Sequence, residues 1–327
     1  MRSIRFAPRF WLAGGGFLLV VLFALLGPLL TGISPNDEAG NSFEPPSGSA
    51  LLGTDNLGND VLTNLMHGTR TSLVIGLTAG IVATVVGTLI GLIAGYRPGF
   101  VEEALMAVTN VTLAIPAIVV LILLSVALPT RSLLALAVVI GLTSWTWTAR
   151  SVRAQTASVR AREHLDVAKL SGAGTWSILR LDILPFLLSY IWMVFVLQVS
   201  AAILAEAALS MLGLGPSDTV SLGNMLHWSL ANEALRQGAW WAFVPPTVFL
   251  TLIAFTLLLL QSSLDEVFNP RLRGRGLAQS TMGAPAGGAG RAPEAQAPAG
   301  VPVGEELGAP NASDSGQAAT ETARRPQ

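Results

Sequence analysis

Long apolar runs alternate with shorter polar segments along most of this chain. A helix needs about 20 predominantly apolar residues to cross the hydrocarbon core of a bilayer, and several runs are of that length. The pattern predicts an all-α polytopic membrane protein with about six transmembrane helices. The runs cover residues 10–31, 72–95, 104–128, 132–149, 186–212 and 238–261.

Two of the runs contain residues that affect helix packing. Glycines recur largely at every fourth position of the second run, on a face where a neighbouring backbone comes close. General packing is the favoured interpretation of this face; a subunit interface or pore lining is the alternative. Asn110 and Pro116 interrupt the third run, and a proline inside a transmembrane helix permits a kink. The glycines are Gly76, Gly80, Gly87, Gly91 and Gly95.

Charged residues are distributed asymmetrically between the runs. Arginines precede the first run, occur throughout residues 150–185 and follow the sixth run, whereas residues 32–70 are predominantly acidic. Because Lys and Arg concentrate in cytoplasmic loops, this pattern places both termini and residues 150–185 in the cytoplasm. An even number of spans agrees with that placement. We therefore expect a multi-pass protein of the cell membrane.

The segments outside the runs suggest a simple domain organisation. Residues 57–72 are compatible with an amphipathic helix at the outer surface, and residues 222–230 with a short outer helix. The C-terminal region is rich in Ala, Gly and Pro, a composition that favours disorder. We expect a first helix and outer segment (1–71), a transmembrane domain (72–265) and a disordered cytoplasmic tail (276–327).

Composition excludes several kinds of chemistry. Only 12% of the residues are charged, against about 25% in soluble domains. The chain has no cysteine, and its three histidines lie far apart without the spacing of metal ligands. The lysine at Lys169 follows no glycine-rich loop, so no phosphate-binding P-loop is present. We expect no catalytic site, no cofactor and no nucleic-acid partner, and any ATP is hydrolysed by another chain.

Residues 150–185 form a basic polar segment between the fourth and fifth runs. Residues 165–170 are compatible with a helix that Gly172 ends in a left-handed conformation. Thr175 is then placed to cap a second helix that begins at Trp176. From the pattern alone, an amphipathic linker resting on lipid headgroups is an equal alternative.

Motifs in this segment resemble a known signature. Asp166-Val167-Ala168, followed by Gly172 and then by Ile183-Leu184-Pro185, is similar to the EAA motif of ABC-importer permeases. Asp166 replaces the usual glutamate and Val167 the usual alanine. Asp182 stands where relatives usually have histidine. The spacing of the glycine and of the Leu-Pro pair is retained.

Other stretches narrow the resemblance to the dipeptide/oligopeptide/nickel permeases, C-type subunit. Residues 52–62, LGTDNLGNDVL, resemble that family's LGTD-x-x-GRDV segment, with Asn59 in place of arginine. Residues 203–215, ILAEAALSMLGLG, resemble its ILAEASLSFLGLG. Residues 223–226, GNML, correspond to its WGNML segment, with Leu222 in place of tryptophan.

The resemblance implies the type I ABC-importer permease fold and a division of labour. Such a permease would form the translocation path with a second, B-type permease subunit, bind an extracytoplasmic substrate-binding protein and contact membrane lipid. ABC ATPase subunits would bind the ATP. Peptides are the family's commonest cargo, although close relatives carry nickel and some glycosides. The loop helix at 163–174 would dock on the ATPase through Glu163, Leu165, Asp166, Ala168 and Gly172.

Two polar residues lie within the fifth run. Glu206 is the one carboxylate inside a run, and an ionisable group there costs several kcal/mol unless it faces water or a partner. We expect Glu206 and Gln198 to contribute to the translocation path. The alternative is that Glu206 makes a packing hydrogen bond to a partner such as Gln198 or Asn110, or lies near the outer interface.

An ion-coupled secondary transporter is the alternative function. Such transporters usually place charged or broken-helix sites at corresponding positions of two repeats. The sequence shows no convincing repeat and a single carboxylate within the runs, so this alternative is disfavoured.

Overall fold

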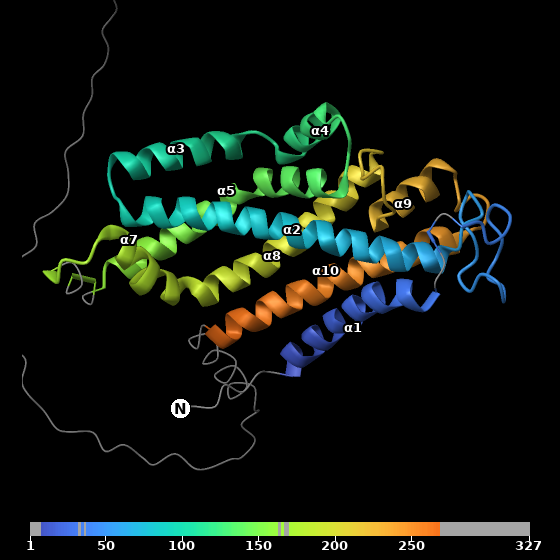
Figure 1. Cartoon of the computed structure of the whole chain (residues 1–327), viewed down its shortest axis with the longest axis horizontal. Coiled ribbons are helices and arrows are strands. Elements are labelled where there is room, and N and C mark those ends of the chain that lie inside the picture. Colours follow the sequence, from blue (N-terminus) through green and yellow to red (C-terminus); the bar gives the residue numbers. More distant parts are fainter. Residues whose placement is uncertain (1–7, 32–33, 36, 163–164, 167–169, 269–327) are drawn as a thin grey trace, which may run out of the picture. The chain divides into compact units, whose positions relative to one another are not determined.

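The computed structural model describes residues 8–31, 34–35, 37–162, 165–166 and 170–268. Within them, five helices are long and apolar enough to cross a membrane, or six if one bent pair counts as a span. The predicted all-α membrane fold is confirmed (Figure 1). The elements are α1 (Pro8–Thr31), α2 (Val61–Tyr96), α3 (Phe100–Ala114), α4 (Ala117–Ala127), α5 (Leu133–Arg160), α7 (Thr175–Ser177), the π-helix η1 (Ile178–Ile183), α8 (Leu184–Met211), α9 (Leu222–Ala231) and α10 (Trp240–Phe268).

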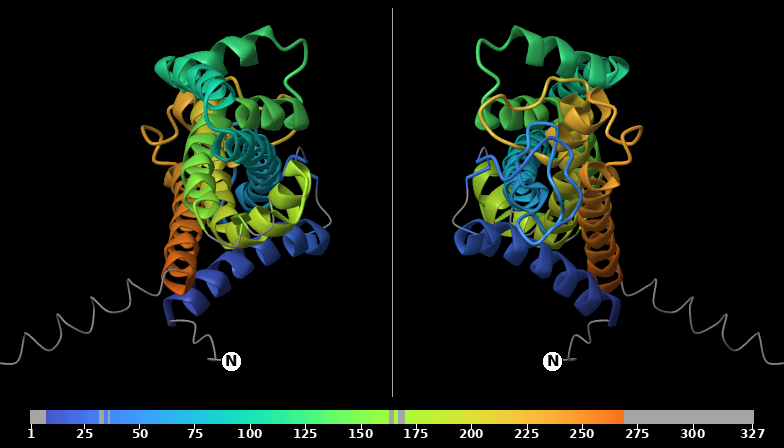
Figure 2. Two further views of the ribbon diagram at one scale, coloured as in Figure 1. Left: turned by 90° about the vertical axis from the view of Figure 1, so that its left-hand side faces the viewer. Right: turned by 90° about the vertical axis from the view of Figure 1, so that its right-hand side faces the viewer.

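Helix α2 is central and contacts α1, α5, α8 and α9. Seen end-on, α3 and α4 lie on one side of α2 and α1 on the opposite side (Figure 2). The glycines of α2 explain the close packing. A Cβ on Gly91 would lie 2.7 Å from the carbonyl oxygen of Ala149 in α5, and one on Gly80 would lie 2.6 Å from the Val199 side chain in α8. The packing interpretation of the glycine face is therefore confirmed.

The start of α2 differs from the prediction. A separate surface helix over residues 57–72 was wrong, because α2 is one continuous helix from Val61. Asp60 is its N-cap, and its carboxylate accepts hydrogen bonds from the backbone N–H groups of Leu62 at 3.4 Å and Thr63 at 2.9 Å. The expected boundary between residues 71 and 72 consequently falls inside α2. The expected tail at 276–327 lies outside the described residues.

The predicted kink in the third run is a sharp break. Helices α3 and α4 meet at 82° across Ile115 and Pro116. A residue before proline is driven out of the α-helical region, and Ile115 has φ −89° and ψ 127°. The run therefore forms two separate helices, α3 and α4.

The end of the fourth run also differs. Helix α5 continues to Arg160, beyond the predicted end at residue 149. Its buried face continues through Val152 and Thr156, which pack against Gly91 and Gly95 of α2. This packing extends the helix into what sequence reasoning treated as a loop, so Arg150 belongs to a long helix.

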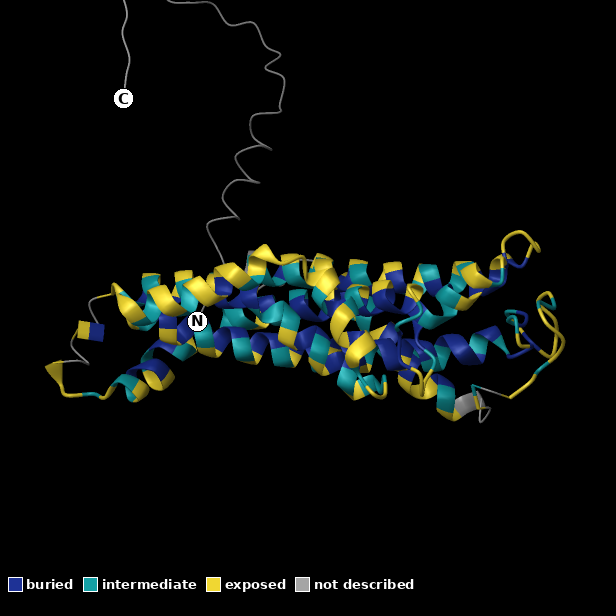
Figure 3. Cartoon of the chain, turned by 90° about the horizontal axis from the view of Figure 1, so that it is seen from above, coloured by how far each residue is buried: buried dark blue, intermediate teal, exposed yellow. Residues whose placement is uncertain are grey.

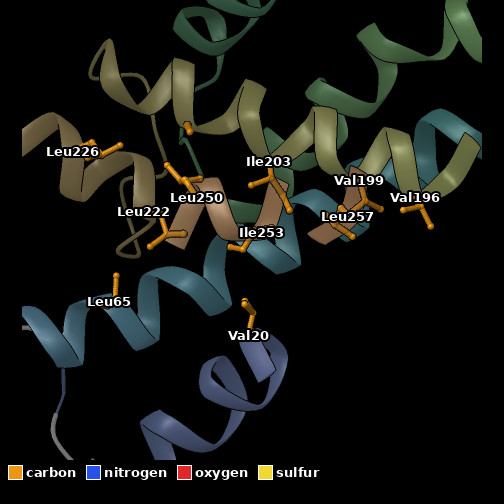
Figure 4. Close-up of a cluster of buried hydrophobic side chains, with 11 residues drawn as sticks. Val20, Leu65, Val196, Val199, Ile203, Leu222, Leu226, Leu250, Ile253 and Leu257 are labelled. Atoms are coloured by element: carbon orange, nitrogen blue, oxygen red, sulfur yellow. The ribbon is translucent and has the colours of Figure 1, made fainter. Parts of the chain in front are cut away.

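Apolar side chains from five helices form one buried cluster within the bundle. Val20 of α1, Leu65 of α2 and Leu222 of α9 lie in one buried cluster with Ile203 of α8 and Ile253 of α10 (Figure 4). Exposed residues line the outward faces of the helices (Figure 3). This distribution is expected of helices that meet lipid or further subunits.

Candidate functional site

The connection between α5 and α8 lies at the end of the bundle opposite α9 (Figure 1). The structure describes three of the five residues predicted for ATPase coupling. Leu165 is 0% exposed, whereas Asp166 and Gly172 are exposed. Glu163 and Ala168 lie outside the described residues.

Leu165 anchors this connection to the bundle. Its side chain is part of a buried cluster drawn from α2, α5, η1 and α8. Burying a leucine side chain contributes about 2 kcal/mol. The residue therefore fixes one point of the connection firmly against the membrane helices. The buried members of the cluster are Leu92, Val152, Val159, Leu165, Ile178, Leu179, Ile183 and Leu187.

The two glycines of the connection have different backbone conformations. Gly172 has φ +78°, as predicted for a left-handed helix end, and a Cβ there would meet nothing within 4 Å. Gly174 has φ −70° and is the N-cap of α7. The predicted cap by Thr175 is wrong, because Thr175 is already the first residue of α7 and the cap makes no side-chain hydrogen bond.

A π-helix joins α7 to α8. Proline lacks a backbone N–H and cannot donate within a helix, and Pro185 lies in the first turn of α8. Just before it, the Leu184 N–H reaches the Leu179 carbonyl, five residues back, which is the π-helical pattern. The chain thus remains helical from Thr175 to Met211, and α7 is directly continuous with a membrane span.

Exposed apolar and charged side chains surround the connection. Leu170 is 90% and Trp176 65% exposed. Arg162 lies 5.3 Å above the Phe186 ring, a cation–π geometry. Large apolar side chains exposed beside charged ones are typical of a protein interaction surface.

Glu206 is buried between α2, α8 and the start of α9, and its side chain is 1% exposed. Its carboxyl oxygens accept hydrogen bonds from three serine hydroxyls, of Ser72 on α2 at 3.0 Å and of Ser210 and Ser221 at 2.6 Å each. The hydroxyls of Ser72 and Ser221 also accept backbone N–H groups at the start of α9. The network thus links α2, α8 and α9.

These contacts correspond to the packing alternative for Glu206, with different partners from those suggested. Gln198 instead donates to the Ser144 carbonyl at 2.8 Å and to the Thr148 hydroxyl at 2.7 Å on α5. Gln198 is 6% exposed. A role for Glu206 or Gln198 in the translocation path remains a prediction.

Two polar pairs join α3 to α5, and sequence reasoning missed them. Arg150 donates to Asn110 at 2.8 Å, and Arg153 forms an ion pair with Glu102. Arg150 and Arg153 had been assigned to a cytoplasmic loop because the end of α5 was placed too early. The sequence does contain a pattern that predicts a longer α5. Val152, Thr156 and Val159 follow one another at intervals of four and three residues, which continues the buried face of the helix.

A cavity of about 570 Å³ opens at the other end of the bundle. Its walls come from the segment before α2, the start of α2 and the loop between α8 and α9. They carry both signs of charge, including Asp55, Arg131 and Asp218. Among the described residues, no group of His, Cys, Asp and Glu side chains has the arrangement of a metal site.

Comparison with known proteins identifies the family. Residues 87–274 match the model of the binding-protein-dependent transport system inner membrane component. The dipeptide transport system permease protein DppC of Bacillus subtilis is 34% identical over 266 residues, covering 79% of this chain and 81% of that protein. The chain belongs to this family of inner membrane transport components.

Other relatives agree with this assignment. The oligopeptide transport system permease protein OppC of Bacillus subtilis is 31% identical, covering 78% of this chain and 83% of its own length. The di/tripeptide permease DppC of Pseudomonas aeruginosa is also 31% identical, covering 78% of this chain and 86% of its own. A solved structure of the MetNI methionine ABC transporter shares the fold, with a TM-score of 0.50 at 19% identity over 63% of this chain and 95% of that chain.

Membership of the binding-protein-dependent transport family confirms the predicted resemblance. The chain is a multi-pass inner membrane protein and the membrane part of an ATP-driven system. Its partners in such a system are an ATPase and a binding protein. The nucleotide chemistry belongs to the ATPase, as predicted.

Proposed function

We propose that this chain is a permease subunit of an ATP-driven peptide importer. The relatives named above are permeases for dipeptides, di/tripeptides or oligopeptides, and they match most of the chain. The translocation path would form between this chain and a second, B-type permease subunit. The exposed apolar faces of α3 and α4 support a position against that subunit or against lipid.

The observation that carries the mechanism is the contrast within the connection between α5 and α8. Leu165 is fully buried against the bundle, while Asp166 and the 90% exposed Leu170 face outward. Exposed side chains held in place by a neighbouring buried residue are available to a groove on a partner protein. In this proposal the groove belongs to the ATPase, and residues 163–174 transmit its movement to the spans.

The proposed orientation places this connection and both chain ends in the cytoplasm. Helix α1 begins and α10 ends toward the α7 end of the bundle (Figure 1). Arg97 and Arg160 lie together just after α2 and at the end of α5. The positive-inside rule favours the cytoplasm for that end. The acidic outer segment and the loop before α9 would then meet the binding protein.

The test of the coupling mechanism uses the two glycines of the connection. Gly172→Val places a β-branched residue at φ +78°, which costs about 1–2 kcal/mol or more. Gly174→Val is the matched control, because its φ of −70° suits valine and its Cβ also meets open space. ATP-driven uptake of a radiolabelled dipeptide by the purified, reconstituted complex should fall several-fold in the first variant alone. Equal uptake by both variants would contradict the coupling role of the Gly172 conformation.

The cargo is tested with the same reconstituted complex and its binding protein. Dipeptide uptake should require ATP, and excess nickel should not compete with it. Uptake of nickel without uptake of di-, tri- or longer peptides would overturn the peptide assignment while leaving the permease assignment intact.

A further inference from the structure

Two adjoining recesses lie where α2 ends. The basic recess is formed by the turn after α2, the first turn of α3 and the end of α5, and is lined by Arg97 and Arg160. The apolar recess, with a volume of about 260 Å³, lies between α2, α7 and η1 (Figure 1). Tyr96 and Arg97 line both, so the two recesses form one groove. The other lining residues are Pro98, Val101 and Ala161 in the basic recess and Ile93, Thr175, Trp176 and Leu179 in the apolar recess.

The basic recess carries positive charge that the described part of the chain does not neutralise. Arg160 donates to the Tyr96 carbonyl at 3.2 Å, which holds its guanidinium group at the recess. Among the described residues, neither Arg97 nor Arg160 forms an ion pair. The acidic residues in the first turn of α3 do not line the groove, and Glu102 is paired with Arg153. Two guanidinium groups suit an anion with several acceptor oxygens, such as a phosphate group.

The apolar recess continues an apolar face of α2. Its accessible lining is almost entirely apolar, and Trp176 at its wall is 65% exposed. Ile93, another lining residue, is the last member of a stripe of exposed apolar side chains on α2, spaced three or four residues apart. A hydrocarbon chain can therefore lie along the stripe and end in the recess. The stripe consists of Val74, Leu77, Ile81, Val85, Leu89 and Ile93.

The groove lies at the end of an uncharged stretch of α2. Residues 71–96 contain no charged side chain, and Arg70 and Arg97 flank them. This stretch is about 39 Å long at 1.5 Å per residue, and the hydrocarbon core is about 30 Å thick. A span of this length brings the arginine at each end to a headgroup layer, where Tyr and Trp are also enriched. Tyr96, Arg97 and Trp176 together have the composition of such a layer.

We propose that this groove binds one anionic phospholipid. The phosphate of the lipid contacts Arg97 and Arg160, and an acyl chain fills the apolar recess and continues along the α2 stripe. Basic pockets between membrane helices bind acidic headgroups in this way. A lipid fits better than a soluble protein, because the positive charge is continuous with an apolar face of a membrane span. Because Trp176 belongs to α7, the bound lipid joins the end of α2 to the helix that follows the connection.

The first test locates the lipid on the assembled complex of permease and ATPase subunits. Phosphatidylglycerol and phosphatidylcholine probes that carry the same photoreactive acyl chain are added separately, and the adducts are mapped by mass spectrometry. The phosphatidylglycerol probe should label residues 93–97 or 175–179 at least about fivefold more than the phosphatidylcholine probe, the selectivity expected of one arginine. Equal labelling by the two probes, or labelling of neither segment, would overturn the proposal.

The second test changes each half of the groove. Arg97→Gln, at an exposed position, should lower labelling by phosphatidylglycerol about fivefold, and adding Arg160→Gln should lower it further. Arg70→Gln is the matched control, because Arg70 is exposed at the other end of the same uncharged stretch.

The apolar half is tested in the same way. Trp176→Ala removes one wall of the apolar recess and should lower labelling several-fold. Leu181→Ala is its control, because Leu181 is 67% exposed and lines neither recess. Wild-type labelling of either Arg97→Gln or Trp176→Ala would contradict the proposed site.

Two further outcomes would assign the groove to another partner and overturn the proposal. If excess inorganic phosphate abolished labelling as effectively as excess unlabelled phosphatidylglycerol, the basic recess would bind a soluble anion. If the isolated chain were labelled but the assembled complex were not, the groove would be a contact with the ATPase or the second permease subunit. Labelling requires no import, so a complex that binds the lipid but carries no peptide would contradict the proposed function alone.

Discussion

Glu206 and Arg150 are ionisable residues on membrane-spanning helices, but their surroundings differ. Glu206 is enclosed by three serine hydroxyls from its own chain and is 1% exposed. Arg150 is exposed and has a single described hydrogen bond, to Asn110. An ionisable group in a membrane needs polar partners. Where the chain supplies all of them, the group stabilises the fold. Where the chain supplies one, the other partners come from water, lipid headgroups or another subunit.

The largest effect on stability is expected at the buried residue Glu206. Glu206→Ala would leave three buried hydroxyl groups without their acceptor and should lower the free energy of unfolding by about 3 kcal/mol. Thermal unfolding of the purified protein in detergent measures this loss. Glu206→Gln keeps the shape and one acceptor oxygen, and should recover most of the stability. Unchanged peptide transport by Glu206→Gln would also rule out a translocation role for the charge.

The connection between α5 and α8 also contains one buried and one exposed residue, Leu165 and Leu170. Leu165→Ala empties part of a buried cluster and should lower stability by about 2 kcal/mol, with a loss of coupled transport. Leu170→Ala removes a side chain that is 90% exposed and should change stability by less than about 0.5 kcal/mol. It should nevertheless weaken co-purification of the ATPase. Equal stability of the two variants would contradict the anchoring role of Leu165.

A smaller effect is expected at one member of the Glu206 network. Ser72→Ala removes a hydroxyl that donates to Glu206 and accepts the Leu222 N–H. The loss should be about 1 kcal/mol. Because Leu222 begins α9, hydrogen exchange of the first amides of α9 should rise in this variant. Unchanged exchange there would show that Ser72 does not hold α9 in place.

The smallest effect on stability is expected at the exposed residue Arg150. Arg150→Gln should change the unfolding temperature little, corresponding to less than about 0.5 kcal/mol, as measured by thermal unfolding in detergent. A loss of stability comparable with that of Glu206→Ala would remove the contrast between the two sites and make Arg150 a structural residue.

Much of the fold follows from local sequence patterns. The apolar runs predicted the spans because crossing a bilayer requires a certain length of apolar helix. The spacing of Gly87 and Gly91 predicted a closely packed face, and Gly172 predicted a left-handed helix end. The start of α2 and the end of α5 were misplaced because polar residues that continue a helix look like a loop when only hydropathy is considered.

The amino-acid sequence by itself determined that this chain is an all-α membrane protein, which segments are basic and, through its motifs, the family. Only the tertiary structure decided which polar groups inside the spans meet. Ser72 lies 134 positions from Glu206, and Asn110 lies 40 from Arg150. Each pairing depends on which faces of distant helices pack together. Hydropathy along one helix carries no information about that choice, because the partners become neighbours only after the bundle has assembled.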